Sequence, residues 1–80
     1  MKIKAQIMVK ENDDQTITVV DLSNGSFFEL NDTATLIFKN IDLSGEALLE
    51  MFKTLYDLPD DFSTTELVAC RDNLRNRFFE

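Results

Sequence analysis

Three arginines near the end of the chain are the residues whose type and spacing point most directly to a binding chemistry. Arg71, Arg75 and Arg77 are the only arginines, and all lie in the segment expected to form the last helix. Arg71 and Arg75 are four residues apart, so they share one helix face. Arginine binds carboxylates through paired donors. The alternative is a solvated face that complements the negative end of the helix, and the spacing alone favours that alternative.

The second feature is a predicted strand, residues 26–30, whose edge the sequence leaves unprotected. This strand contains neither Lys nor Pro, which commonly block an open sheet edge, whereas the first strand carries Lys2, Lys4 and Lys10. An open edge can accept an extended peptide as an additional strand. The alternative is that a helix or loop of the same chain covers it. If this strand and the arginine-bearing helix pack side by side, both features border one groove.

Length and composition exclude several classes of protein. Eighty residues are enough for one small core, so we expect a single domain spanning residues 1–80. The net charge is -7, from 15 acidic and 8 basic residues, which argues against nucleic-acid and membrane partners. The absence of His and the presence of one Cys exclude a Cys/His zinc site and a Ser-His-Asp triad. No segment resembles a signal peptide or a membrane span. We therefore expect a cytoplasmic, non-enzymatic domain without a metal or cofactor.

The first half of the chain has the residue pattern of strands. Alternation from Ile3 to Val9 predicts one strand, and the β-branched segment 16–22 predicts a second. Asn24-Gly25 predicts a two-residue type I′ turn into the third strand. This turn pairs Leu22 with Phe27, Asp21 with Phe28 and Val19 with Leu30. One face then carries Ile17, Val19, Phe28 and Leu30, and the other carries Val20, Leu22 and Phe27.

The second half has helical spacing. Asn31 or Asp32 is expected to cap a first helix and Ser44 a second. Ser63 and Glu66 fit a capping box at the start of a third helix. The apolar stripe of that helix comprises Leu67, Cys70, Leu74 and Phe78. The sequence therefore predicts an α+β fold with a three-stranded antiparallel sheet followed by three helices.

The segment from Asp21 to Phe38 resembles the PqqD-like family. The shared pattern is an aspartate before a glycine turn, an aromatic residue, and then Leu30-Asn31 opening a helix with alanine and isoleucine–aromatic positions. The similarity continues through Tyr56-Asp57 to the stripe of the third helix and covers roughly residues 16–78. The chain departs from the family pattern at Phe38, where Trp is frequent, and at Cys70 and Arg71, where aliphatic residues are common.

The resemblance implies a winged-helix-like RiPP recognition element, a domain that binds the leader of a ribosomally made precursor peptide. The leader adds a strand to residues 26–30, and its side chains enter the groove beside the third helix. Such a domain is a non-catalytic adaptor that presents the peptide to a separate modifying enzyme or leader peptidase. By position, the strand site comprises Ser26, Phe27, Phe28, Glu29 and Leu30, and the helix wall comprises Val68, Arg71, Asn73, Arg75 and Phe78.

This interpretation predicts the side chains that the leader carries. An apolar residue is expected near Phe28 and Val68, and an acidic residue near Arg71 or Arg75.

Two other functions fit the same elements. A winged-helix DNA-binding domain would need a basic surface, which the net charge of -7 opposes. A structural subunit could dimerise by pairing two copies of the open strand edge.

Overall fold

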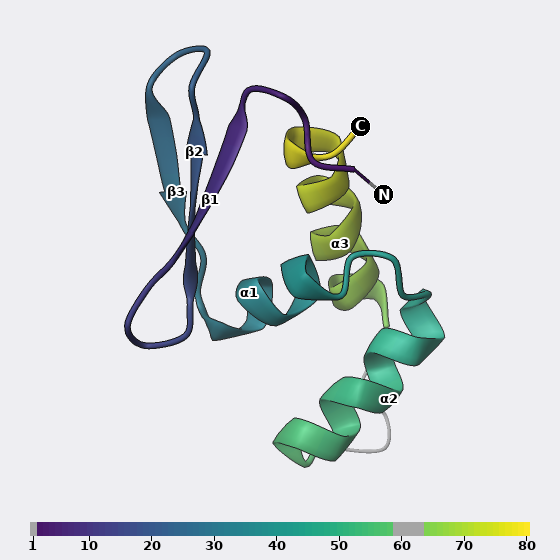
Figure 1. Ribbon diagram of the computed structural model, residues 1–80. Helices are drawn as coiled ribbons and strands as arrows, with labels where there is room; N and C mark the ends of the chain where they lie inside the picture. The colour runs from purple at the N-terminus through teal and green to yellow at the C-terminus, as the bar shows by residue number, and fades with distance from the viewer. Residues whose placement is uncertain (1, 59–63) are drawn as a thin grey trace.

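The computed structural model describes residues 2–58 and 64–80. Three antiparallel strands, β1 (Ile7–Glu11), β2 (Ile17–Asp21) and β3 (Ser26–Glu29), precede three helices, α1 (Asp32–Lys39), α2 (Gly45–Tyr56) and α3 (Thr65–Phe78). Figure 1 shows α1 and α3 beside the sheet and α2 farther from it. The predicted α+β order is confirmed.

The strands form one sheet in the order β1-β2-β3, so β1 and β3 are its two edges. The sheet packs one face against the helices. Ile17 and Val19 of β2 are fully buried on that face, together with Ile37 of α1 and Leu48 of α2. The opposite face is open: Met8 is 49% exposed and Phe27 is 67% exposed. The predicted distribution of apolar residues over both faces is therefore confirmed.

The hairpin between β2 and β3 has a longer loop than predicted. Val19 pairs with Phe28 and Asp21 pairs with Ser26, so residues 22–25 form the loop. The predicted two-residue turn is wrong, and so are the three pairs derived from it, Leu22–Phe27, Asp21–Phe28 and Val19–Leu30. The error is a shift of two residues. Because side chains alternate with a period of two, this shift leaves every residue that stays in the strands on its predicted face, whereas Leu22 lies in the loop.

The side chain of Asp21 accounts for the longer loop. Its carboxylate accepts the N–H of Ser23 at 2.9 Å, and its carbonyl accepts the N–H of Gly25 at 2.9 Å. An aspartate that bonds the backbone two residues later forms a turn of its own. Within this loop only Gly25 has a positive φ, 75°, whereas a type I′ turn needs two such residues.

The first strand is shorter than predicted, because the chain turns before Ile7. The N–H of Ile7 donates to the carbonyl of Lys4 at 3.0 Å, and Ile3 forms an isolated antiparallel bridge with Phe79. The N–H of Lys4 donates to the carbonyl of Phe78 at 3.0 Å. The alternating pattern continues across this turn, so it could not mark the strand's start. The N-terminal residues therefore hold the last turn of α3, and Figure 1 shows the two ends of the chain close together at that end of the helix.

Two of the three predicted helix caps are confirmed. Asn31 caps α1 through Oδ1, which accepts the N–H of Ala34 at 2.8 Å. Ser44 caps α2 through Oγ, which accepts the N–H of Ala47 at 3.1 Å. The predicted cap Ser63 lies outside the described residues. Helix α3 begins at Thr65, and its N-cap residue Thr64 makes no side-chain cap hydrogen bond.

Candidate functional site

The outer edge of β3 carries backbone groups that no strand of the sheet pairs. The N–H of Leu30 donates to the carbonyl of Ile17 at 3.0 Å, so the backbone of Leu30 faces β2. Alternate residues of an antiparallel strand turn their backbone groups to opposite sides. The backbone N–H and C=O groups of Phe28 therefore also face β2, whereas those of Phe27 and Glu29 face away from the sheet. The predicted open edge is present, and its free donors and acceptors belong to these two residues.

On the inner face of β3, Phe28 meets the last turn of α3. Its ring centroid lies 5.5 Å from that of Phe78, with the rings tilted by 58°. The guanidinium carbon of Arg77 lies 4.4 Å from the centroid of Phe28, within the range of a cation–π contact. Phe78 is only 2% exposed, so it forms the floor behind Phe28 and the exposed Arg77 forms the rim. Arg77 was not among the residues predicted to contact the peptide.

Helical periodicity identifies the other residues on the side of α3 that faces β3. Asn73 and Cys70 precede Arg77 by four and seven residues, so they lie on the same side of the helix. Asn73 is exposed, and Cys70 is half-buried against the core. Burial raises the pKa of the Cys70 thiol above its ordinary value, which fits a packing residue. Of the predicted polar residues of the helix wall, Asn73 alone is on this side.

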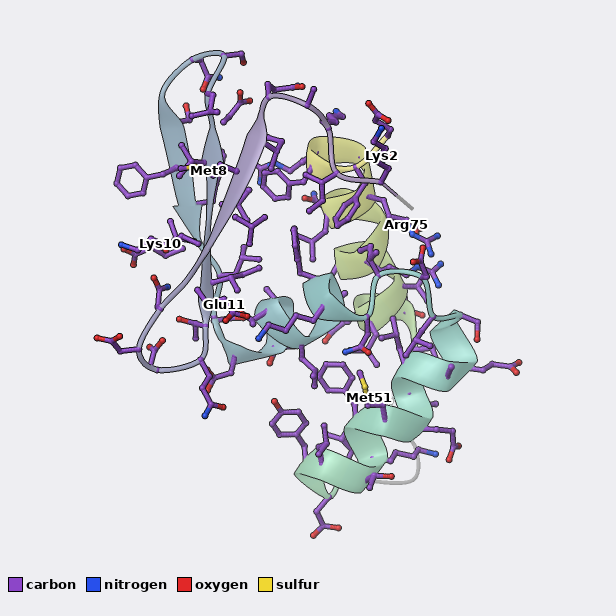
Figure 2. The ribbon with its side chains drawn as sticks, in the orientation of Figure 1. Lys2, Met8, Lys10, Glu11, Met51 and Arg75 are labelled. Atoms are coloured by element: carbon purple, nitrogen blue, oxygen red, sulfur yellow. The ribbon has the colours of Figure 1, made fainter. Side chains whose placement is uncertain are left out.

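Arg71 and Arg75 do not border β3. Arg75 donates from Nε and Nη2 to the carbonyl of Ile41 at 3.2 and 2.6 Å. Arg71 donates from Nη1 to the carbonyl of Leu43 at 3.0 Å and pairs with Asp72 at 3.3 Å. Figure 2 shows Arg75 on the side of α3 away from the sheet. Both guanidinium groups hold the connection between α1 and α2, so the prediction that they face the groove is wrong.

The geometry of the helix explains this arrangement. Arg75 and Arg77 are two residues apart, and two residues along an α-helix are about 160° apart around its axis. The two side chains must point to nearly opposite sides of α3. Arg71 is four residues before Arg75 and shares its side, as predicted.

Val68 also lies on the side of α3 that faces α2. A Cβ placed on Gly45 would come within 2.7 Å of Cγ2 of Val68, so the first residue of α2 packs directly on this side chain. Val68 precedes Arg75 by seven residues and lies on the same line of the helix. The predicted place of Val68 beside Phe28 is therefore wrong.

The remaining predicted residues of the strand lie at its two ends and on its outer face. Ser26 is half-buried opposite Asp21, and Leu30 is half-buried against the core. Phe27 and Glu29 are exposed on the outer face. No cation of residues 2–58 or 64–80 pairs with Glu29, and no carboxylate of these residues pairs with Arg77.

Two hollows lie near the sheet. One, of about 390 Å³, opens at the end of β3 and is lined by Asp14, Thr16, Glu29, Leu30, Asn31 and Asp32. The other, of about 440 Å³, is lined by residues of the β1–β2 turn, α1 and α2, and none of its lining residues belongs to β3 or α3.

The described part of the chain contains no cluster of His, Cys, Asp or Glu that could hold a metal ion. Nor does it contain a helix long and apolar enough to cross a membrane.

Three antiparallel strands followed by three helices, with one strand edge open beside the last helix, define a fold present in solved structures. The chain is similar to a lasso peptide synthetase B1 complexed with its leader peptide, with a TM-score of 0.76 and 21% identity over 96% of this chain and 93% of that one. It is also similar to TbiB1 in complex with the TbiA(beta) leader peptide, with a TM-score of 0.72 and 19% identity over 96% and 91% of the two chains.

These similarities show a shared fold, with the order of three strands and then three helices that the residue patterns predicted. No family model matches the chain, and no curated protein matches it in sequence.

Proposed function

We propose that the protein is a non-catalytic adaptor that binds the leader segment of a ribosomally made precursor peptide. The leader adds a fourth strand to β3, along residues 26–30, and places side chains in the groove between β3 and α3. The adaptor then presents the peptide to a separate modifying enzyme or leader peptidase. Because ribosomes make the precursor, we place this encounter in the cytoplasm.

One observation carries the proposal: the backbone groups of Phe27 and Glu29 are unpaired within the sheet, and they flank Phe28, whose ring packs against Phe78 of α3. Proteins usually block such edges, since an open edge recruits other chains. The two solved structures with the same fold are complexes with leader peptides, which supports a peptide as the missing strand.

The groove favours two kinds of leader side chain. Phe28 is half-buried against the core and offers an apolar contact to an inward-pointing aliphatic or aromatic residue. Arg77 at the rim has no carboxylate partner among the described residues, so an acidic leader residue would find a free guanidinium there. The acidic residue predicted for Arg71 or Arg75 is thus assigned to Arg77. With few anchors, we expect a contact area below about 1,200 Å², in the range of transient complexes.

The charge distribution argues against the DNA-binding alternative. The chain carries a net charge of -7, and the guanidinium groups of Arg71 and Arg75 are bound to backbone carbonyls. A DNA-binding surface needs basic side chains free to reach phosphates.

Amide hydrogen exchange tests the proposal. The probe is a synthetic peptide with the leader sequence of a precursor peptide, to be sought among the genes that neighbour the gene for this protein. Binding should slow exchange at the N–H groups of Phe27 and Glu29, while the N–H of Leu30, already bonded to Ile17, should change little. Sedimentation of the same samples separates the dimer alternative: a tight dimer that the peptide does not disturb, with those two amides protected beforehand, would refute the adaptor model.

A further inference from the structure

The outer face of the sheet contains two side-chain rows that end at the open edge. In the first row, Met8 pairs with Val20 and Val20 pairs with Phe27. In the second row, Lys10 pairs with Thr18 and Thr18 pairs with Glu29. Figure 2 shows Met8 and Lys10 on the side of the sheet away from α3. The groove lies on the other face, so the proposed function uses neither row.

Both rows end on exposed side chains that the sheet leaves without a neighbour on one side. Phe27 is 67% exposed, more than any other large apolar residue in the described part of the chain. Glu29 has no cation partner among the described residues. Asp14 and Asp32 line the same hollow as Glu29, so the surroundings of this end of β3 are acidic.

We propose that Phe27 and Glu29 select the outward-pointing residues of the bound peptide, and that the peptide carries Lys or Arg beside Glu29 and an apolar residue beside Phe27. This inference rests on the proposed function and adds a second recognition surface to it. One peptide strand would then contact β3 on both faces, with alternate side chains pointing toward α3 and toward the outer face.

The spacing of these residues follows from the geometry of strand pairing. Side chains on one face of a strand are two residues apart, and directly opposed residues on neighbouring strands have Cβ atoms about 5 Å apart. Antiparallel pairing is the more stable arrangement, and in it the peptide residue opposite Glu29 precedes the residue opposite Phe27. The peptide should therefore contain a basic residue, then a groove-facing residue opposite Phe28, and then an apolar residue.

Each pair has a physical reason. An apolar residue beside Phe27 extends the row of Met8 and Val20 and removes the exposed ring from water. A basic residue beside Glu29 forms a cross-strand ion pair, whereas an acidic residue there would be repelled. We expect each match to strengthen binding by up to about fivefold, the upper end of the range of single cross-strand pairs.

Selection from a displayed library of random peptides tests this specificity. The wild-type protein, Glu29→Lys and Phe27→Ser are each used as bait. Wild type should enrich peptides with Lys or Arg two positions before an apolar residue. Glu29→Lys should exchange the basic preference for Asp or Glu, and Phe27→Ser should lose the apolar preference. Both substituted residues are exposed, so both variants should keep the fold.

Two control variants make the same kinds of change away from the edge of β3. Glu50→Lys makes the charge change of Glu29→Lys at an exposed residue of α2. Met8→Ser removes an apolar side chain from the row of Phe27, but on β1, the opposite edge strand. Both controls should keep the wild-type preferences. If Glu29→Lys still enriches basic peptides while those peptides slow exchange at the amides of Phe27 and Glu29, the specificity inference is wrong and strand addition stands. If enriched peptides leave these amides unchanged, the proposed function itself fails.

Discussion

The guanidinium of Arg77 covers the ring of Phe28, with 4.4 Å between the guanidinium carbon and the ring centroid. A cation in the last turn of α3 therefore lies on the inward-facing aromatic residue of the edge strand. Because no carboxylate of the described residues pairs with Arg77, its charge is available to a ligand that enters between β3 and α3. The contact connects the helix wall of the groove to the strand that would receive the peptide.

Replacing Arg77 should weaken both the fold and binding, by different amounts. Arg77→Ala removes the cation–π contact and should lower the free energy of unfolding by about 0.5–1 kcal/mol, measured by urea denaturation. Arg77→Glu should further weaken binding of a leader with an acidic groove-facing residue, measured by peptide titration. Lys53→Glu, which makes the same charge change on α2, away from the sheet, is the control. Equal losses of affinity in Arg77→Glu and Lys53→Glu would indicate a general charge effect instead of a local pair.

Arg75 should behave as a structural residue. Its two donations to the carbonyl of Ile41 are partly buried, and hydrogen bonds from charged groups contribute about 1.5–3 kcal/mol. Arg75→Ala should lower the free energy of unfolding by about that amount and leave the peptide affinity of the folded protein unchanged. The measurements are urea denaturation and peptide titration at a temperature where the variant is folded. A loss of affinity without a loss of stability would contradict this prediction and indicate that Arg75 contacts the peptide.

The strands, the helices and two of the caps could be predicted because they depend on neighbouring residues. Asn31 and Ser44 cap helices through contacts three residues away. The alternation through Ile17 and Val19 assigns the buried face of β2 without knowledge of the partner strand. Even the hairpin error preserved the faces, since the true register differs by two residues. Local pattern was sufficient for these features.

The wall of the groove could not be predicted in the same way. The apolar stripe of α3, with Leu74 at its centre, is flanked by Arg77 on one side and Arg75 on the other. Sequence spacing correctly places Arg71 with Arg75, but it does not say which flank meets β3. That depends on how α1, α2 and the N-terminal residues hold the helix against the sheet. The sequence did contain one indication that Arg77 borders the packed face of α3, because it follows Cys70 of the apolar stripe by seven residues and shares its side of the helix.

Gly45→Ala tests the contact between α2 and α3. The added methyl group would lie 2.7 Å from Cγ2 of Val68, a β-branched side chain with little freedom to move aside. Overpacking of this kind costs about 1–3 kcal/mol, although alanine gains up to about 1 kcal/mol over glycine in a helix. We expect a net loss in the free energy of unfolding. Adding Val68→Ala should recover part of that loss in a double-mutant cycle, and simple additivity of the two changes would contradict the contact.

The turn after β2 should contribute to stability in a pH-dependent way. Hydrogen bonds from the side chain and then the backbone of Ser23 lower the pKa of Asp21 below its ordinary value of 3.8. Because the folded pKa is the lower one, ionised Asp21 stabilises the fold above pH 3.8, and this contribution is lost as the pH falls through the folded pKa. Ser23→Ala should raise the pKa of Asp21 toward 3.8, measured by NMR titration of its carboxyl carbon. The pKa of Asp14, which Thr16 lowers, should stay unchanged and serves as the control.

N-methylation of the leader peptide tests which backbone groups of the edge it uses. The outward groups belong to Phe27 and Glu29, so in an antiparallel complex only the peptide residues opposite these two exchange hydrogen bonds with β3. Methylating either of those peptide nitrogens removes one donor and places a methyl group against the strand. Titration calorimetry should then show a loss of at least about fivefold in affinity, since an acceptor left unpaired costs about 1–3 kcal/mol. Methylating the residue between them, whose N–H points to solvent, should change affinity by less than about threefold and is the matched control. Equal losses at all three positions would contradict strand addition, because only a paired strand distinguishes alternate nitrogens.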